Sequence, residues 1–141
     1  MAHRIKHETE SAARLLALVV ASNGRVDPRE LAMLDELDAF ERLGVLRARV
    51  IGLAQDSVRE QAAEPAPRLW LSLGAQWQLD HLLDDVADPA QRLLLCRLAA
   101  AVVTADGRVT SDERQVYTHM LARWGISDAM VTQAILADRR A

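Results

Sequence analysis

The sequence predicts an all-α fold, and three observations lead to this prediction. Half of the 141 residues are hydrophobic but only 4% are aromatic, so Leu, Ala and Val must build the core. Glycines and prolines are few, which favours helices packed closely on helices. Strongly apolar segments alternate with turns and helix-start signals. At this length the chain fits one domain, residues 1–141, that can bury a substantial core.

The first two helices are expected to differ in burial. The first covers about residues 8–21, and its stretch "LLALVVA" is apolar on nearly every side, which indicates a buried, central helix. The second begins at Pro28, with Asp27 as its N-cap and Glu30 closing a capping box. Gly44 is expected to end this second helix.

The middle of the chain is expected to contain a third helix, an irregular connection and a short fourth helix. The third helix covers about residues 46–62. Two prolines and a glycine interrupt residues 63–77, which are therefore predicted to be a connection, with Trp70 and Trp77 anchoring it to the core. The stretch "QLDHLLDDVA" over residues 78–87 predicts a short amphipathic helix.

Three helices are expected in the last third of the chain. The sequence "DPAQ" from Asp88 repeats the cap, proline and capping-box signal and opens the most hydrophobic stretch, "AQRLLLCRLAAAVVTA". We expect this helix to lie deep in the fold and to contact the first buried helix, with Cys96 as an inert core residue. Two further helices are predicted, one from Thr110 to Gly125 and one after Ser127.

The chain also contains a duplicated helix pair. In each copy an apolar helix ends in Asn/Asp-Gly-Arg-Val, a capping box follows, and an amphipathic helix runs to Gly-Val or Gly-Ile. The first copy spans about residues 13–45 and the second about residues 95–126. No tandem copy follows either, so the pattern predicts a pseudo-twofold pair and not a solenoid.

The second copy, "AAAVVTADGRVTSDERQVYTHMLARWGI", resembles the tellurite-resistance TerB-like family. It is also similar to the N-terminal domain of some membrane-anchored DnaJ-type co-chaperones. The resemblance implies a compact all-α bundle of about seven helices with an acidic cluster that binds a divalent metal. It further implies no catalytic activity, and a role in bacterial stress response, as in tellurite resistance, or in assembling membrane-associated complexes with protein partners.

The family motif places its acidic positions at Asp106 and Glu113 in the second copy and at Glu30 in the first. Asn23 departs from the family pattern, which has an aspartate there, and this removes one charge from the implied site. Asp106 also follows the C-terminal end of a helix, where backbone carbonyls disfavour a carboxylate unless Arg108 or a cation is near.

Two interpretations of the acidic motifs remain open. The spacing of one copy matches only the rear half of an EF-hand loop, so a cation site requires both copies to pool oxygens from Asp106, Glu113, Asn23, Asp27 and Glu30. Such hard ligands suit Ca²⁺ or Mg²⁺. Alternatively, the carboxylates are only helix caps that complement the helix dipole, and the chain is a metal-independent structural adaptor.

Composition excludes several other functions. A net charge of −3 and a pI near 5.8 argue against nucleic-acid binding. No apolar stretch is long enough for membrane insertion, no secretory signal is apparent, and a single Cys96 fits a cytoplasmic protein. His81 and His119 are expected to be isolated surface or boundary residues, whereas His3 and His7 are four residues apart and could share a helix face, in a terminal segment that is expected to fray.

No enzyme motif is present, so we expect a non-catalytic interaction module. The sequence has no phosphate-binding glycine loop, no His-Glu-x-x-His and no nucleophile with an evident base. An enzyme ranks third, behind the cation-binding module and the structural adaptor, because catalytic groups can assemble from distant residues.

Overall fold

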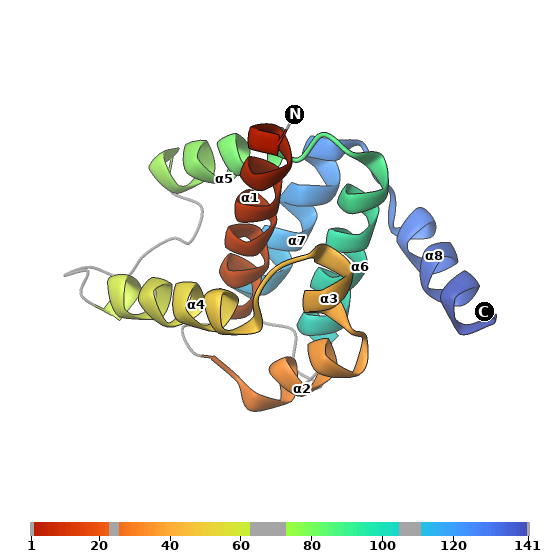
Figure 1. The fold of residues 1–141 in the computed structure, drawn as a ribbon, viewed down its shortest axis with the longest axis horizontal. Helices are drawn as coiled ribbons and strands as arrows, with labels where there is room; N and C mark the ends of the chain where they lie inside the picture. The colour runs from red at the N-terminus through yellow and green to blue at the C-terminus, as the bar shows by residue number, and fades with distance from the viewer. Residues whose placement is uncertain (1, 23–25, 63–72, 105–110, 141) are drawn as a thin grey trace.

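The computed structural model describes residues 2–22, 26–62, 73–104 and 111–140, with side chains described for 8–22, 26–60, 77–104 and 114–137. Within these ranges the chain forms eight α-helices and no strand, which confirms the predicted all-α fold (Figure 1). The helices are α1 (Ala2–Ala21), α2 (Pro28–Glu36), α3 (Ala39–Leu43), α4 (Arg47–Ala62), α5 (Leu73–Asp85), α6 (Pro89–Thr104), α7 (Ser111–Trp124) and α8 (Asp128–Arg140).

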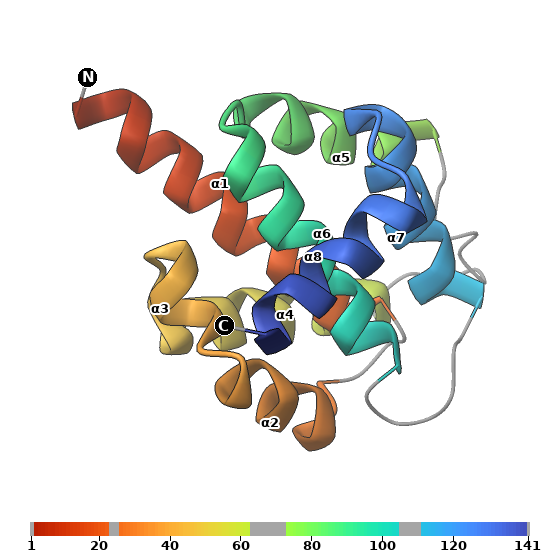
Figure 2. The same cartoon turned by 90° about the vertical axis from the view of Figure 1, so that its right-hand side faces the viewer.

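Helices α1 and α6 form the centre of the molecule. They contact each other, and α1 also packs on α4 and α5 while α6 packs on α2, α7 and α8. Leu15 and Leu16 in α1 and Leu98 and Val102 in α6 are almost completely buried. The prediction that the two most apolar helices meet in the core is therefore confirmed, and the remaining helices surround them (Figures 1 and 2).

The predicted cap signals mark real helix ends. Helices α2 and α6 both begin at the proline that follows an aspartate, as expected. The Asp88 carboxylate accepts the N–H of Ala90 at 3.3 Å, and Gly125 ends α7 with a positive φ of 65°. Glycine adopts this left-handed conformation without the steric penalty that a Cβ atom would bring.

Three predicted boundaries were wrong. The helix expected over residues 28–44 is two helices, because Asp38 adopts a left-handed φ of 53°, which aspartate tolerates better than most residues. This break turns Phe40 and Leu43 of α3 toward the core, where both are buried. Helix α1 begins at Ala2, since no breaker precedes residue 8. Helix α5 begins at Leu73 within the predicted connection, whose other residues lie outside the described ranges.

Surface ion pairs join α4 to its neighbours. Arg49 of α4 donates to Glu10 of α1 at 2.5 Å, and Arg47 of α4 makes a bidentate pair with Asp35 of α2 at 2.9 and 3.1 Å. The hydrogen bond from Arg49, more than any other contact, lowers the pKa of the Glu10 carboxyl. The four side chains are 41–50% exposed, so these pairs fix geometry more than they stabilise the fold.

Helix α8 lies at the edge of the bundle and projects from it (Figure 1). Its buried residue is Val131, which forms a small separate apolar cluster with Cys96 and Leu121. Met130 of the same helix is 47% exposed. Helix α8 therefore packs on α6 through this separate cluster and contributes no residue to the main core cluster.

Candidate functional site

The first candidate site is the beginning of α2. Asp27 has an extended backbone, with φ −85° and ψ 123°, and its carboxylate accepts the N–H of Arg29 at 2.9 Å. The Arg29 guanidinium lies against the same carboxylate, with Nη2 3.5 Å from Oδ2. Only 4% of Asp27 is exposed. Asp27 is thus the N-cap that its position before Pro28 predicts.

Glu30 lies one turn further and is completely buried, with 0% of its surface exposed. It shares a helix face with Leu34, also 0% exposed, because residues four apart lie one above the other on a helix. Helix α2 packs on α6. Among the described residues, the Glu30 carboxylate makes no hydrogen bond to the Asp27 N–H, so the predicted capping box is present only in its Asp27 half.

The other predicted ligands belong to parts of the chain whose side chains the structure does not describe. Asn23 and Asp106 lie outside the described residues. Glu113 is in the first turn of α7, but its side chain is also outside them. The C-terminal end of α6 lies at the same lower end of the molecule as α2 (Figures 1 and 2). Of the five predicted ligands, the structure therefore brings together Asp27 and Glu30.

Within the described residues, no three side chains of His, Cys, Asp or Glu are placed to hold one metal ion. Asp27 and Glu30 alone supply two carboxylates on one helix turn. Ca²⁺ takes six to eight oxygen ligands, so it would need additional oxygens there.

A polar ladder between α5 and α7 was missed by the sequence analysis. His119 Nε2 lies 2.6 Å from Asp80 Oδ1, and Arg123 donates to both oxygens of Asp84 at 3.0 and 2.7 Å. Arg123 lowers the pKa of the Asp84 carboxyl through these hydrogen bonds. The signal was present in the sequence, since the two acids are four residues apart and so are His119 and Arg123.

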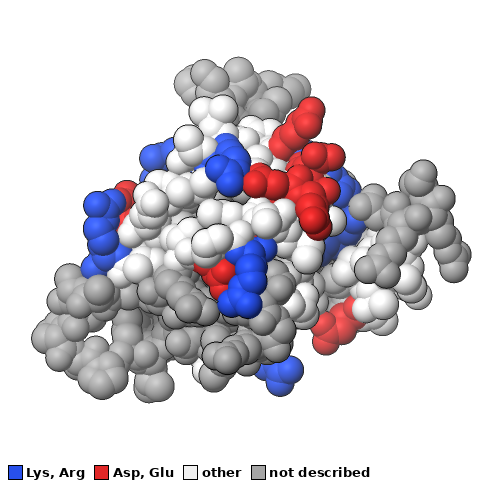
Figure 3. Space-filling view, turned by 90° about the horizontal axis from the view of Figure 1, so that it is seen from below, with Lys and Arg blue, Asp and Glu red and all other residues white. Residues whose placement is uncertain are grey.

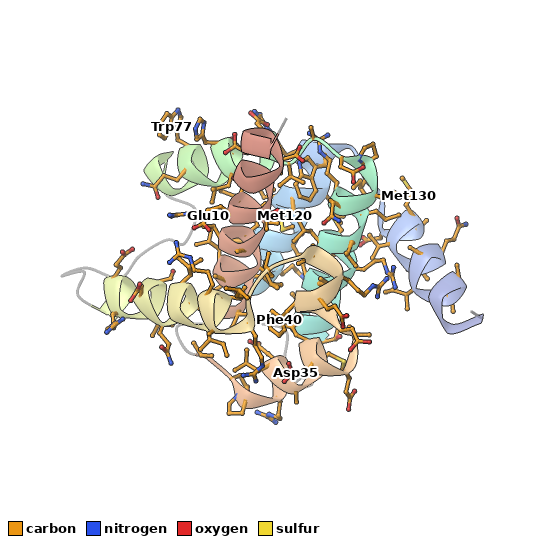
Figure 4. The ribbon with its side chains drawn as sticks, viewed as in Figure 1. Glu10, Asp35, Phe40, Trp77, Met120 and Met130 are labelled. Atoms are coloured by element: carbon orange, nitrogen blue, oxygen red, sulfur yellow. The ribbon has the colours of Figure 1, made fainter. Side chains whose placement is uncertain are left out.

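The prediction that Trp77 anchors the connection to the core is wrong. It is 70% exposed and stacks on His81 with ring centroids 5.7 Å apart and planes within 5°. Figure 4 shows Trp77 on the outer side of α5, away from the bundle. Trp70 lies outside the described residues, and of the two described tryptophans it is Trp124 that reaches inward, where its Nε1 donates to the carbonyl of Leu83 at 2.9 Å.

Cys96 is the only cysteine of the chain, and its thiol has no access to solvent. Burial raises the pKa of the Cys96 thiol to about 12. Since the thiolate is the reactive species, this side chain is not a nucleophile at neutral pH, as predicted for a core cysteine.

Comparison of the chain with protein-family models, curated proteins and solved structures finds no match. None of the described helices combines the length and the apolar character that crossing a bilayer requires.

Proposed function

We propose that the chain is a non-catalytic helical interaction module of the TerB-like type. In this proposal it binds a divalent cation, Ca²⁺ or Mg²⁺, between its two Asn/Asp-Gly-Arg-Val motifs and recognises protein partners in stress response or complex assembly. The observation that carries the proposal is Glu30, a carboxylate with 0% exposure one turn after the nearly buried Asp27.

Complete burial of a carboxylate is costly unless cations or hydrogen-bond donors compensate it. A divalent cation is one such compensation, and the motif resemblance independently implies it at Glu30. The arrangement of α2 and α6 is consistent with this, since α6 ends at Thr104, two residues before Asp106, on the same side of the molecule as α2. Carboxylate, amide and carbonyl oxygens are the ligands that Ca²⁺ and Mg²⁺ prefer.

One observation favours the alternative, a metal-independent structural adaptor. The Asp27 carboxylate is already used as the N-cap of α2, and Asp88 caps α6 in the same way without any connection to the motif. On this interpretation the acidic residues shape helix ends, and ions do not change the stability of the fold.

Thermal unfolding separates the two functions. We expect millimolar Ca²⁺ or Mg²⁺ to raise the melting temperature of the wild type above its value in chelator, because a ligand at 100 times its Kd stabilises a fold by about 2.7 kcal/mol. Glu30→Gln, Asp106→Asn and Glu113→Gln should each reduce this increase, since each removes a charge and nearly keeps the side-chain shape. Asn23→Asp should enlarge it.

The matched control is Glu60→Gln, which removes one charge from an exposed position on α4. It should respond to the ions as the wild type does. If the wild type and Asn23→Asp both melt at the same temperature with chelator and with ions, the cation site is wrong and the adaptor remains.

A further inference from the structure

A groove of about 520 Å³ lies between α1, α3 and the turn that leads into α6. Its apolar residues are Ala12, Leu43 and Val86, each from a different segment and each nearly buried, so they form its floor. The volume falls within the range of about 300–1,000 Å³ that is typical of ligand-binding clefts. The groove is separate from the beginning of α2, since neither Asp27 nor Glu30 lines it.

The rim of the groove is predominantly acidic. Glu8 of α1, Glu41 of α3 and Asp88 before α6 line it, and Arg42 is the basic side chain among its described lining residues. Glu8 is held in place by the N–H of Ala87, which it accepts at 3.0 Å. Three carboxylates from three segments therefore surround an apolar floor and give the described part of the rim a net negative charge.

The acidic surface continues beyond the groove. Glu36 and Asp38, at the corner between α2 and α3, are exposed like Glu41. Their neighbour Asp35 pairs with Arg47, whereas no ion pair joins Glu36, Asp38 or Glu41 to a described lysine or arginine. Figure 3 shows carboxylate residues gathered on one part of the lower face. A ligand that follows this surface must be longer than a small molecule.

A single metal ion does not suit the rim, because the acids of the described ranges include no set of three that could share one. Separated carboxylates instead match the spaced charges of arginine or lysine side chains. We propose that this groove docks a basic, amphipathic segment of a partner protein. An apolar side chain of that segment packs on Leu43 and Val86, and its cations pair with Glu8, Glu41 and Asp88. This inference rests on the proposed function as an interaction module and adds the chemistry of the partner.

The test is the binding of a short, fluorescein-labelled peptide that alternates arginine and leucine, followed by fluorescence anisotropy. Saturable binding is expected at low salt and should weaken as salt rises, because exposed charges are screened. The triple variant Glu8→Gln, Glu41→Gln, Asp88→Asn should bind about tenfold more weakly, since each exposed ion pair contributes only a modest factor. These substitutions preserve the hydrogen bonds to Ala87 and Ala90.

A charge-matched control distinguishes the groove from general attraction. The variant Asp56→Asn, Glu60→Gln, Asp128→Asn removes the same three charges from exposed positions outside the groove and should bind like the wild type. Gln91→Arg places a competing cation in the groove and should weaken binding without changing the melting temperature. In amide NMR spectra of the wild type, the peptide should shift the signals of Gly44 and Ala87.

Three results would overturn the docking proposal. One is no saturable binding by the wild type; another is equal weakening in both triple variants. The third is a concentration-dependent dimer that the groove variant alone disrupts while peptide binding is unchanged, because the occupant is then a second copy. The effect of cations on the melting temperature depends on Glu30 and the motif residues, whereas peptide binding depends on the groove. Failure of the cation site and failure of the docking groove are therefore separate outcomes.

Discussion

At the start of α2, Asp27 holds its carboxylate over the first helical turn and accepts the N–H of Arg29 at 2.9 Å. That role depends only on neighbours in sequence, so Asp followed by proline predicts it correctly. Glu30 differs, because its burial results from the packing of α2 on α6, which is far along the chain. A local pattern therefore predicts a cap but not the removal of a carboxylate from water.

The cap leads to a prediction for single substitutions. Asp27→Ala should lower the free energy of unfolding by roughly 0.5–2 kcal/mol, because one N–H in the first turn of α2 loses its acceptor. Asp27→Asn should retain most of the stability, since its amide oxygen accepts the same bond. Urea unfolding in chelator measures both, and an alanine variant as stable as the wild type would show that the cap contributes nothing.

At the scale of elements, α5 and α7 show why some contacts were predictable and others were not. Asp80 and Asp84 face His119 and Arg123 as two matching pairs at helical spacing. The spacing was visible in the sequence, but the pairing of α5 with α7 was not. Trp77 illustrates the opposite case, since a large apolar residue next to a supposed connection suggested burial, whereas α5 places it outward.

Helix α6 is the element whose burial the sequence predicted most directly. Leu98→Ala should cost about 2–5 kcal/mol, because a fully enclosed leucine leaves a cavity as well as losing apolar contact. Leu136→Ala on α8 is the matched control, because that leucine is 46% exposed, and its cost should stay below about 1 kcal/mol. Equal losses in chemical denaturation would contradict the assignment of α6 to the core.

For the whole molecule, the sequence predicted an all-α bundle around two buried helices because apolar periodicity determines which faces must leave water. It did not predict the separate helix α3. That helix exists because Asp38 adopts a left-handed backbone conformation, which the residue type permits but does not require. The groove was also beyond sequence reasoning. Its lining comes from three segments, and only their packing places Glu8, Glu41 and Asp88 around one floor.

The same packing predicts unequal stability across the fold. Helices α1 and α6 carry most of the main core cluster and contact most other helices, so their amides should exchange with solvent only through global unfolding. Helix α8 contributes Val131, with Ile135 packed beside it, to a small separate cluster and exposes Met130 and Leu136. It can detach without opening the core, so its amides should exchange with a lower opening free energy.

Native-state hydrogen exchange in increasing urea measures this difference. Amides in α8 should exchange by an opening that depends weakly on urea, because little surface is exposed, whereas those of Leu16 and Leu98 should follow the global transition. Val131→Ala should lower the protection of amides in α8. It should leave the protection of α1 relative to that of α6 unchanged, since Val131 lies outside the main cluster. If α8 instead exchanges together with α6 at every urea concentration, the molecule unfolds as one cooperative unit and its small apolar contact is as strong as the core.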